Sequence, residues 1–349
     1  MKIISGLLVA LVLVWGITYY RVNNETHEYA AVSTAQREAA QTYLQGKLTA
    51  PHSDWQWVEF EAAPGVILRG GKLKHENAKG TVMVVPGFTG SIEMTLREIN
   101  QIHAAGFSVA AVEYRGQGKS YRPLNNPEKG YVEDYKLLAK EVLSFARTHQ
   151  EPNKPLFFYS ISKGAHITMR MAAELEPDIA AYALMVPMIK INTGTLGYET
   201  VRTLATVLQT LGLGKMYAPG QGAYTPEEYN VATPCNGNPD TAQSQGAMFA
   251  LNPELRTRGS TVKWLYETFR SSDLLLDPKY SRNISAPVLL FTAGIDHLVD
   301  SDAAQQFCDG LPNCKLTHVE QARHCITREN FAVYDGLVDQ AITHFNAQL

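Results

Sequence analysis

The sequence has few cysteines, no low-complexity tract and no large excess of charge of either sign. Four of its 349 residues are cysteines and none of them forms a C-x-x-C pair, so a zinc site with common ligand spacing is not expected. A formal net charge of −3 supplies no broad positive field, which argues against nucleic acid as a partner. With 45% hydrophobic and 19% charged residues, disordered, collagen-like and coiled-coil chains are excluded. A globular chain remains, long enough for one large domain with an insertion or for two modest domains.

The four cysteines leave two interpretations open. Cys308 and Cys314 flank an Asp-Gly-Leu-Pro turn, so in an exported protein they could close a short disulfide. They could equally be small apolar residues of a core. Cys325 is expected to pack rather than to take part in chemistry.

The one long apolar run lies at the N-terminus, between Lys2 and Arg21. Its eighteen residues, 3–20, would reach roughly 27 Å as a helix, enough to span a bilayer core. We therefore expect residues 1–22 to form a membrane anchor that holds the body outside the cytoplasm, in the periplasm or extracellular space. The alternatives are a secretion signal cleaved near Val-Trp-Gly, which would release a secreted body, and a buried core helix.

Residues 23–52 form a short connecting stretch, and strand and helix patterns alternate after it. Ser33 and Gln36 are spaced as a capping box and predict a helix, interpreted as a stalk or surface element, to about Lys47. Residues 55–60 and 66–68 flank a Pro-Gly turn and predict a β-hairpin. Continuous apolar runs then alternate with helical patterns, as in a mostly parallel, doubly wound α/β sheet. The expected strands are 81–85, 107–112, 155–159, 180–186, 287–291 and 316–319, and the expected helices are 92–105, 131–149 and 163–175.

The alternation stops between residues 187 and 280. We therefore expect a core made of residues 53–186 and 281–349, with 187–280 inserted as a helical lid. Apolar residues recur there at helical spacing, and such a helix could cover an acyl chain or simply pack on the core. These residues are Leu196, Val201, Leu204, Val207, Leu208 and Leu211.

The motif Ser-Ile-Ser-Lys-Gly-Ala, residues 160–165, lies between an expected strand and an expected helix. This is the context of a nucleophile elbow, G-x-S-x-G, in which a sharp turn exposes the serine hydroxyl. Ser160 replaces the first glycine with another small residue. Taken alone, the motif is as consistent with a serine-rich loop as with a nucleophile at Ser162.

Two further groups at strand ends favour the nucleophile. A serine hydroxyl is a weak nucleophile, so it needs a base and a group that orients this base. Asp296 follows the strand 287–291 and His324 follows the strand 316–319, and the order Ser, Asp, His is that of α/β-hydrolases. The nearby rivals are Asp300, expected to cap a helix, and His297, expected at the rim.

The oxyanion of a tetrahedral intermediate needs hydrogen-bond donors. In this fold they are the amide after the nucleophile and one amide from an earlier strand-end loop, here Lys163 and Phe88. Phe88 belongs to the Pro-Gly-Phe-Thr-Gly-Ser loop, residues 86–91, whose glycines suit a tight turn.

These motifs together resemble the bacterial lysophospholipase and monoacylglycerol lipase branch of the α/β-hydrolases, over residues 55–345. Glu-Tyr-Arg-Gly-Gln-Gly-Lys-Ser, residues 113–120, is similar to the family's Asp-His-Arg-Gly-x-Gly-x-Ser, and Ala-Arg-His, 322–324, to its Ala-x-His. Pro86-Gly87 is similar to the lysophospholipase pattern, as are three lid segments, 217–222, 252–255 and 259–264. The resemblance implies substrate contacts at Gly87 and Trp264. This sequence departs from the family at Ser160, Glu113 and Cys325.

The resulting expectation is a serine esterase that cleaves the acyl ester of a lysophospholipid or monoacylglycerol through an acyl-enzyme on Ser162. No metal, no organic cofactor and no obligate protein partner is indicated, whereas a membrane bilayer is. The alternatives are a lipid acyltransferase, a proline-type peptidase, and a catalytically inactive scaffold with this fold. A carboxylate nucleophile, as in dehalogenases, is excluded by Ser162.

Overall fold

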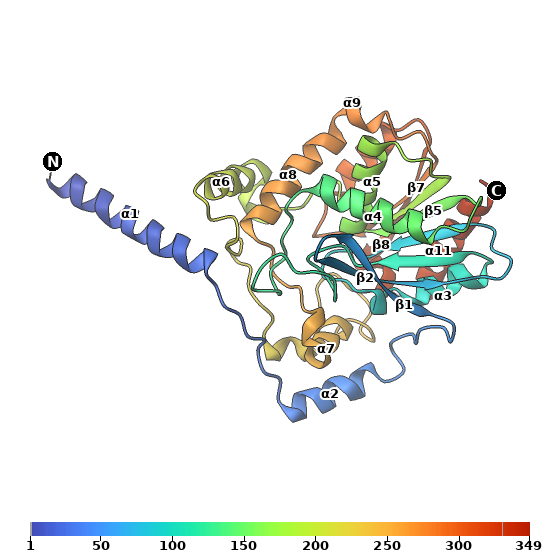
Figure 1. Ribbon diagram of the computed structural model, residues 1–349, viewed down its shortest axis with the longest axis horizontal. Coiled ribbons are helices and arrows are strands. Elements are labelled where there is room, and N and C mark those ends of the chain that lie inside the picture. Colours follow the sequence, from blue (N-terminus) through green and yellow to red (C-terminus); the bar gives the residue numbers. More distant parts are fainter. Residues whose placement is uncertain (1, 330) are drawn as a thin grey trace.

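The computed structural model describes residues 2–329 and 331–349 and is built around one eight-stranded sheet (Figure 1). Its strand order is β1-β2-β4-β3-β5-β6-β7-β8. β1 and β2 form an antiparallel hairpin at one edge, β2 also pairs antiparallel with β4, and all remaining neighbours are parallel. The strands are β1 (Gln56–Ala63), β2 (Val66–Leu73), β3 (Thr81–Val85), β4 (Ser108–Val112), β5 (Leu156–Ile161), β6 (Ala181–Met185), β7 (Val288–Ile295) and β8 (Cys314–Arg323). The predicted mostly parallel α/β sheet is confirmed.

Helices cover both faces of the sheet, which is why the central strands are continuous apolar runs. Met83 and Val85 face one core, which also contains α4 (Tyr135–His149) and α5 (Lys163–Leu175). Val82 and Val84 face the other core, with α3 (Leu96–Ala104) and α11 (Phe331–Asn346). α10 (Ser301–Asp309) follows β7, and the short 3₁₀ turns η1 (Ile92–Met94) and η5 (Ile326–Arg328) precede α3 and α11.

Two helices form as predicted but differ in detail, one in what it packs against and the other in where it begins. α2 (Thr34–Leu44) begins after Ser33, whose side chain makes the expected capping box with Gln36. α2 packs against α7 through Ala40, Leu44 and Met248, so it lies on the body. α4 begins four residues later than predicted, because the Asp134 side chain caps it by accepting from Lys136 N.

The segment between β6 and β7 is built of helices and turns, with isolated β-bridges but no further strand of the sheet among the described residues. In chain order these are η2 (Gly194–Leu196), α6 (Tyr198–Thr210), η3 (Pro226–Asn230), α7 (Ser244–Leu251), η4 (Pro253–Leu255), α8 (Val262–Leu276) and α9 (Pro278–Ser281). An isolated antiparallel bridge between Ile191 and Val299 closes the base of this insertion. α8 is part of the core, since Phe269 and Leu275 are buried beside the sheet, whereas η2, α6 and the residue that caps α6 leave apolar side chains exposed. The exposed ones are Leu196, Leu204, Val207 and Leu211.

α1 (Lys2–Asn23) extends away from the body (Figure 1). Within the described part of the chain, no helix combines the length and the apolar character needed to cross a membrane. The prediction of an N-terminal membrane anchor with the body held outside the cytoplasm is therefore wrong on this finding. The C-terminal part of α1 contacts the insertion instead, where Trp15 Nε1 donates to the carbonyl of Leu211 at 3.0 Å.

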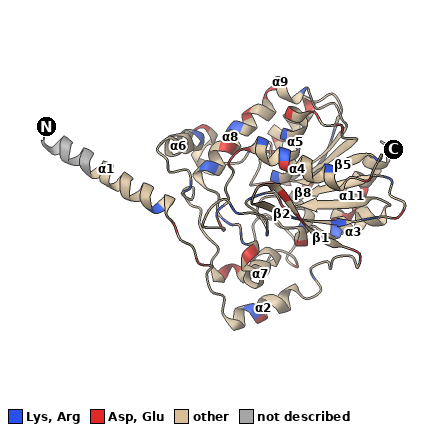
Figure 2. Cartoon of the chain, viewed as in Figure 1, with Lys and Arg blue, Asp and Glu red and all other residues tan. Residues whose placement is uncertain are grey.

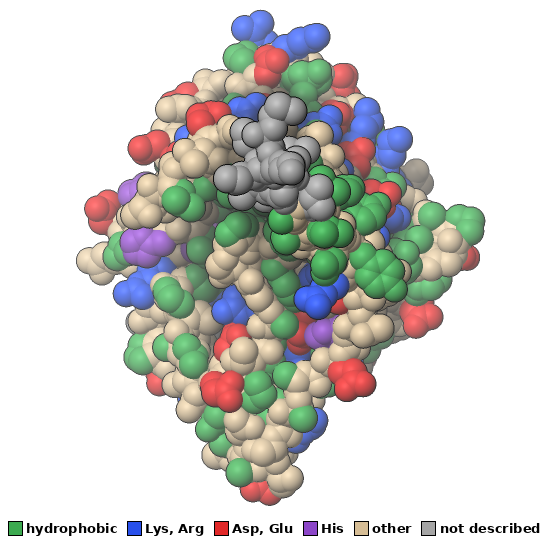
Figure 3. All heavy atoms as spheres, turned by 90° about the vertical axis from the view of Figure 1, so that its left-hand side faces the viewer, with side chains coloured by type: hydrophobic (Ala, Val, Ile, Leu, Met, Phe, Trp, Pro, Cys, Tyr) green, Lys and Arg blue, Asp and Glu red, His purple; other side chains and the backbone are tan. Residues whose placement is uncertain are grey.

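The face of the molecule from which α1 extends carries both apolar and charged side chains. Figure 3 views this face directly and shows green apolar side chains interspersed with charged ones. Acidic and basic residues are likewise mixed over the rest of the body (Figure 2).

All four cysteines form disulfides. Cys308 pairs with Cys314, which decides between the two interpretations that the sequence left open. Cys235 pairs with Cys325, 90 residues away. The expectation that Cys325 only packs is wrong, because the insertion brings Cys235 beside the loop of His324.

Candidate active site

Ser162 occupies a sharp turn between β5 and α5. Its φ of +50° and ψ of −112° lie in a region that side-chain-bearing residues rarely adopt, and its amide donates to the carbonyl of Met185 at 2.9 Å. A Cβ on Gly164 would lie 2.4 Å from the carbonyl oxygen of Val85, so the turn needs glycine at that position. Ser160 fits where the family has glycine, because its buried hydroxyl hydrogen-bonds Thr168 Oγ1 at 2.8 Å. The local geometry is that of a nucleophile elbow.

The structure brings together Ser162, His324 and Asp296, three residues from separate strand ends. His324 Nε2 lies 2.9 Å from Ser162 Oγ, and His324 Nδ1 lies 2.7 Å from Asp296 Oδ2. Ser162 and His324 are both buried, and the Asp296 side chain is 1% exposed. The arrangement is a continuous hydrogen-bonded chain from carboxylate to imidazole to hydroxyl.

Asp296 is held by its own loop. Its Oδ1 accepts hydrogen bonds from the amides of Leu298 at 2.8 Å and Val299 at 3.0 Å, which leaves Oδ2 directed at the imidazole. The two rivals have other positions. Asp300 caps α10 and pairs with Lys190 at 2.9 Å, and His297 is exposed.

Two backbone amides lie beside the serine with no protein acceptor. Neither Phe88 N nor Lys163 N donates a hydrogen bond within the part of the chain that the structure describes. Gly87 is next to the nucleophile, since a Cβ there would lie 3.3 Å from Ser162 Cβ. A larger residue would therefore crowd the position where a carbonyl substrate must approach.

Gln117 holds the loop that carries Phe88, a role that the sequence analysis missed although the residue lies in the 113–120 motif. Its Nε2 donates to the carbonyl of Gly87, and its Oε1 accepts from Thr89 N at 3.1 Å and from the Tyr114 hydroxyl at 3.0 Å. Gln245, from α7 of the insertion, supports the same loop by donating to Thr89 O at 2.9 Å and Oγ1 at 2.7 Å.

Glu113, at the start of the 113–120 motif, is the centre of a buried charged cluster near the Phe88 loop. Glu113 is fully buried and accepts hydrogen bonds from Arg69, from Ile92 N and from Lys119 N. Burial raises the pKa of its carboxyl, against the opposing effect of the Arg69 guanidinium. Gly118 is required here because a Cβ would lie 2.0 Å from a carboxylate oxygen of Glu113.

The side chain of Lys163 lies in an aromatic cage. Its Nζ is 5.3 Å from the ring centroid of Phe88 and 6.0 Å from that of Trp264, and two tyrosine rings complete the surroundings. Burial lowers the pKa of this ammonium to about 7. Trp264, the second predicted substrate contact, packs on Phe88 at 5.1 Å between centroids, and its Nε1 is buried without a hydrogen-bond partner.

A pocket of about 70 Å³ opens at Ser162 and His324. Its wall includes the Phe88 loop, Gln245 and Arg328, a residue that the sequence analysis did not single out. An arginine in a C-terminal loop resembles any surface arginine in sequence, so only its place in the fold marks it.

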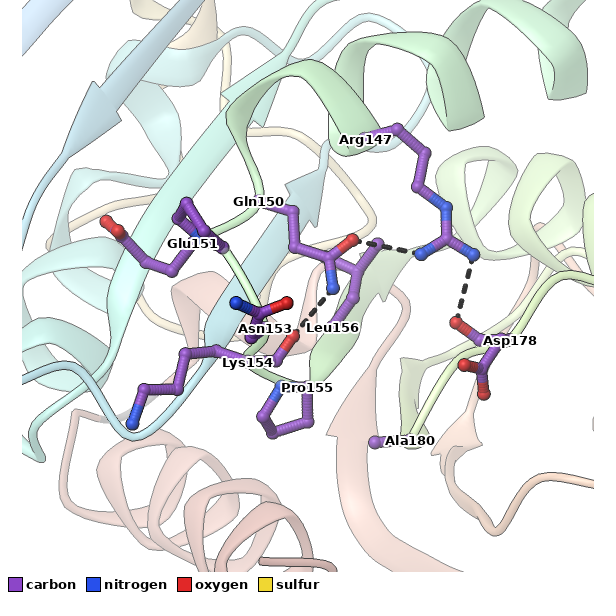
Figure 4. Close-up of a pocket in the computed structure, with 10 residues that line it drawn as sticks. Arg147, Gln150, Glu151, Asn153, Lys154, Pro155, Leu156, Asp178 and Ala180 are labelled. Carbon is purple, nitrogen blue, oxygen red and sulfur yellow. Dashed lines mark hydrogen bonds between the residues drawn. The ribbon is translucent and has the colours of Figure 1, made fainter.

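A larger hollow of about 570 Å³ lies away from these residues, at the start of β5 (Figure 4). Several of its polar groups are bonded to one another: Arg147 donates to Gln150 Oε1 at 2.9 Å and to the carbonyl of Asp178 at 3.1 Å, and Gln150 donates to the carbonyl of Lys154. It contains no nucleophile with a base beside it, so the smaller pocket is the candidate active site.

Comparison with known proteins agrees with this fold. A hydrolase family model described as "Serine aminopeptidase, S33" matches residues 76–330. The chain is 25% identical over 250 residues to "Probable lysophospholipase L2" of Haemophilus influenzae, which covers 69% of this chain and 75% of the relative. It is 22% identical over 256 residues to lysophospholipase L2 of Escherichia coli K12, covering 72% and 74%. The fold is shared with a monoglyceride lipase of Saccharomyces cerevisiae, with a TM-score of 0.66, 16% identity and coverage of 86% and 96%.

The family model spans well over half of the chain and includes strands β3 to β8, the insertion and all three residues of the hydrogen-bonded chain. The chain therefore belongs to the serine aminopeptidase S33 family, and it is an α/β-hydrolase similar to lysophospholipases and monoacylglycerol lipases.

Proposed function

We propose that this protein is a serine esterase that cleaves the acyl ester of a lysophospholipid or a monoacylglycerol through an acyl-enzyme on Ser162. The observation that carries the proposal is the buried chain of hydrogen bonds from Asp296 through His324 to Ser162, beside two amides that lack an acceptor. The names of the relatives, lysophospholipase and monoglyceride lipase, support an acyl ester as the substrate.

In the acylation step, His324 Nε2 takes the proton of Ser162 Oγ as this oxygen attacks the ester carbonyl. The negative charge that develops on the carbonyl oxygen is stabilised by the amides of Phe88 and Lys163. Asp296 keeps the proton on His324 Nδ1 and stabilises the imidazolium that forms. Collapse of the tetrahedral intermediate passes the proton to the leaving alcohol, and the acyl group stays on the serine.

Deacylation repeats these steps with water as the nucleophile. His324 takes a proton from water, the hydroxide attacks the acyl-enzyme, and the fatty acid leaves with the Ser162 proton restored. The same acyl-enzyme could be intercepted by a lipid alcohol, which would make the protein an acyltransferase. The ratio of free fatty acid to transferred product measures which acceptor is used.

We further propose that residues 187–280 act as a lid over a core made of 53–186 and 281–349. Two contacts support this role: Gln245 of the insertion holds the Phe88 loop, and Trp264 packs on Phe88 itself. In the acyl-enzyme, the acyl chain attached to Ser162 would contact side chains of the insertion on one side and side chains of the core on the other.

The description of the family raises aminopeptidase activity as a second candidate. An aminopeptidase must bind the α-ammonium of its substrate, and a carboxylate is the usual partner for such a cation. Among the described residues that line the pocket none carries a carboxylate, and the group with a fixed charge is the cation of Arg328. The lining therefore favours a neutral or anionic substrate.

The test is hydrolysis by the purified full chain of four substrates: a lysophospholipid, a monoacylglycerol, a short acyl ester and an aminoacyl amide. Ser162→Ala is assayed alongside, and a fluorophosphonate probe reports whether the serine is reactive. We expect ester cleavage that disappears in Ser162→Ala, together with labelling of the wild type alone. Cleavage of the amide in preference to every ester would establish the peptidase, and absence of both turnover and labelling would establish an inactive scaffold.

A further inference from the structure

Arg328 is the one arginine or lysine whose side chain lines the pocket of Ser162 and His324 among the described residues. It lies four residues after His324, at the end of η5. The pocket wall around it is polar and small, with Thr327, Ser91 and Thr95 among its members. With a volume of about 70 Å³ the pocket is small for a ligand site, so we expect it to receive the polar end of a substrate.

The guanidinium of Arg328 has unused hydrogen-bonding capacity. Its Nη1 is buried and has no hydrogen-bond partner, and no ion pair joins it to a carboxylate within the described residues. Glu98 is close enough to raise the pKa of Arg328 but forms no ion pair with it among the described residues. Glu329, the next residue, forms none either, and its Oε1 accepts from the amides of Gly237 and Arg323. Burial lowers the pKa of Arg328 to about 10, so the side chain remains a cation at neutral pH. Arg328 as a whole is half-buried, but its Nη1 is shielded from water, and a cationic nitrogen held there without an acceptor carries a desolvation cost that an anionic ligand would offset.

The Cys235–Cys325 disulfide holds this side chain in place. Arg328 Nη2 lies 2.7 Å from Cys325 Sγ and 3.7 Å from Cys235 Sγ, so the guanidinium rests against the sulfurs on one side. Sulfur is a weak acceptor and does not neutralise a positive charge. The contact fixes the direction of the guanidinium in a residue that lines the pocket, without neutralising its charge.

Resting on the proposed esterase function, we propose that Arg328 binds the phosphate of the substrate head group and so makes lysophospholipids preferred over neutral monoacylglycerols. A guanidinium presents paired donors that match the oxygens of a phosphate. In a 1-acylglycerol 3-phosphate the phosphate lies on the same glycerol as the scissile ester. An ester carbonyl at Ser162 and a phosphate at Arg328 can thus belong to one molecule, whose polar groups would contact two residues that line the same open pocket.

The experiment compares 1-octanoylglycerol 3-phosphate with 1-octanoylglycerol, which share the ester and differ in the phosphate. The full chain is assayed as wild type, Arg328→Gln and Arg328→Lys. Arg323→Gln is the matched control, because it removes the same charge at the nearby end of β8, where the guanidinium donates to the carbonyl of Pro234 instead. Glycerol 3-phosphate and inorganic phosphate are tested as inhibitors of octanoylglycerol cleavage, to separate recognition of a head group from binding of a free anion.

We expect Arg328→Gln to lower kcat/KM for the phosphorylated substrate by about 10- to 100-fold, the usual effect of losing a hydrogen bond to a charged group. Octanoylglycerol cleavage should change less than about threefold, Arg328→Lys should recover part of the loss, and Arg323→Gln should behave as wild type. Glycerol 3-phosphate should inhibit the wild type and not Arg328→Gln.

Three outcomes would overturn the inference. Equal loss on both substrates would make Arg328 a structural residue, and no loss on either would leave it without a role in recognition. Inhibition by inorganic phosphate equal to that by glycerol 3-phosphate, without any preference between the two lipids, would indicate a site for a free anion. These results leave the esterase proposal intact, whereas a wild type that cleaves neither substrate and resists the fluorophosphonate probe removes both proposals. If Arg328→Gln does not fold, Arg328→Lys and the inhibitor pair still decide the question.

Discussion

Cys325, the residue directly after His324, is covalently joined to Cys235 in the insertion. A backbone hydrogen bond also links the two residues, since Cys325 N donates to the carbonyl of Cys235 at 2.7 Å. The proposed general base therefore sits on a loop that is attached at two points to a segment 90 residues earlier. Four experiments follow from this relationship and from others in the site.

Removing this disulfide should affect both stability and turnover. In the chain-entropy estimate, a crosslink over 90 residues contributes about 4–5 kcal/mol and one over 6 residues about 2 kcal/mol. We expect Cys235→Ala with Cys325→Ala to lower Tm more than Cys308→Ala with Cys314→Ala, measured by calorimetry. The first pair should also lower kcat, since His324 and Arg328 both depend on that loop. A larger loss of kcat in the second pair would contradict this assignment.

Asp296→Asn should impair the chemical step without unfolding the protein. The asparagine keeps the size of the side chain but lets the imidazole adopt the wrong tautomer, which in comparable triads costs about a thousand-fold or more in kcat. Asp300→Asn is the control, because that carboxylate caps α10 and pairs with Lys190. It should lower Tm only slightly and leave kcat within about threefold, because asparagine caps a helix as well as aspartate does and only the partly exposed ion pair with Lys190 is lost. Equal kcat in the two variants would remove Asp296 from the triad.

Gln117→Leu should reduce kcat through the loop that carries Phe88. The leucine fills similar space but cannot donate to Gly87 O or accept from Thr89 N. Loss of one oxyanion donor costs about a hundred-fold or more, so partial misplacement of Phe88 should cost about ten-fold. The assay is acylation rate by a chromogenic ester in the pre-steady state, with KM followed separately. An unchanged acylation rate would show that the loop keeps its geometry without this side chain.

Lys163→Met should stabilise the protein, most of all at neutral and lower pH. The pKa of this lysine falls from 10.5 in the unfolded chain to about 7 in the folded protein, because of burial. Between these two values the unfolded state binds more protons, so the wild type gains stability as pH rises from 7 to 10.5. Each pKa unit corresponds to about 1.4 kcal/mol, which makes several kcal/mol the upper limit of the effect.

The measurement for this variant is urea unfolding at pH 7 and pH 9.5. Lys163→Met should lose the rise in stability with pH, while its backbone amide still serves the oxyanion. Lys154→Met, at an exposed position, is the control and should keep the pH dependence of the wild type. A destabilised Lys163→Met would mean that the ammonium makes a favourable contact in the cage.

Those parts of the site that depend on strand ends were predictable from the sequence. Apolar runs mark buried parallel strands, their carboxyl ends meet at one edge, and so Ser162, Asp296 and His324 could be expected together although they are far apart in the chain. The capping box at Ser33 was predictable for a local reason, since its partners are three residues apart. Such inferences need only the period of the hydrophobic pattern along the sequence and the order of the strands and helices.

The features that were missed or wrong depend on the path of the insertion. Nothing near Cys235 indicates that it meets Cys325, because the approach is set by how α6 to α8 fold over the sheet. Arg328 could not be distinguished from a solvated arginine until its sulfur neighbours and its pocket were known. The apolar run of residues 3–20 was interpreted from its composition, and a hydropathy pattern does not contain the contact between Trp15 and Leu211.

The bridge between Ile191 and Val299 gives the insertion a narrow base. The chain leaves the sheet after β6 and returns at β7, and these two strands are direct hydrogen-bonded neighbours. The chain segment between β6 and β7 can therefore be lengthened, shortened or exchanged without changing the order of the strands in the sheet. In evolution the sheet edge that carries Ser162 and the insertion can diverge at different rates, and in the laboratory the insertion of a relative could be grafted at this base as a single cassette.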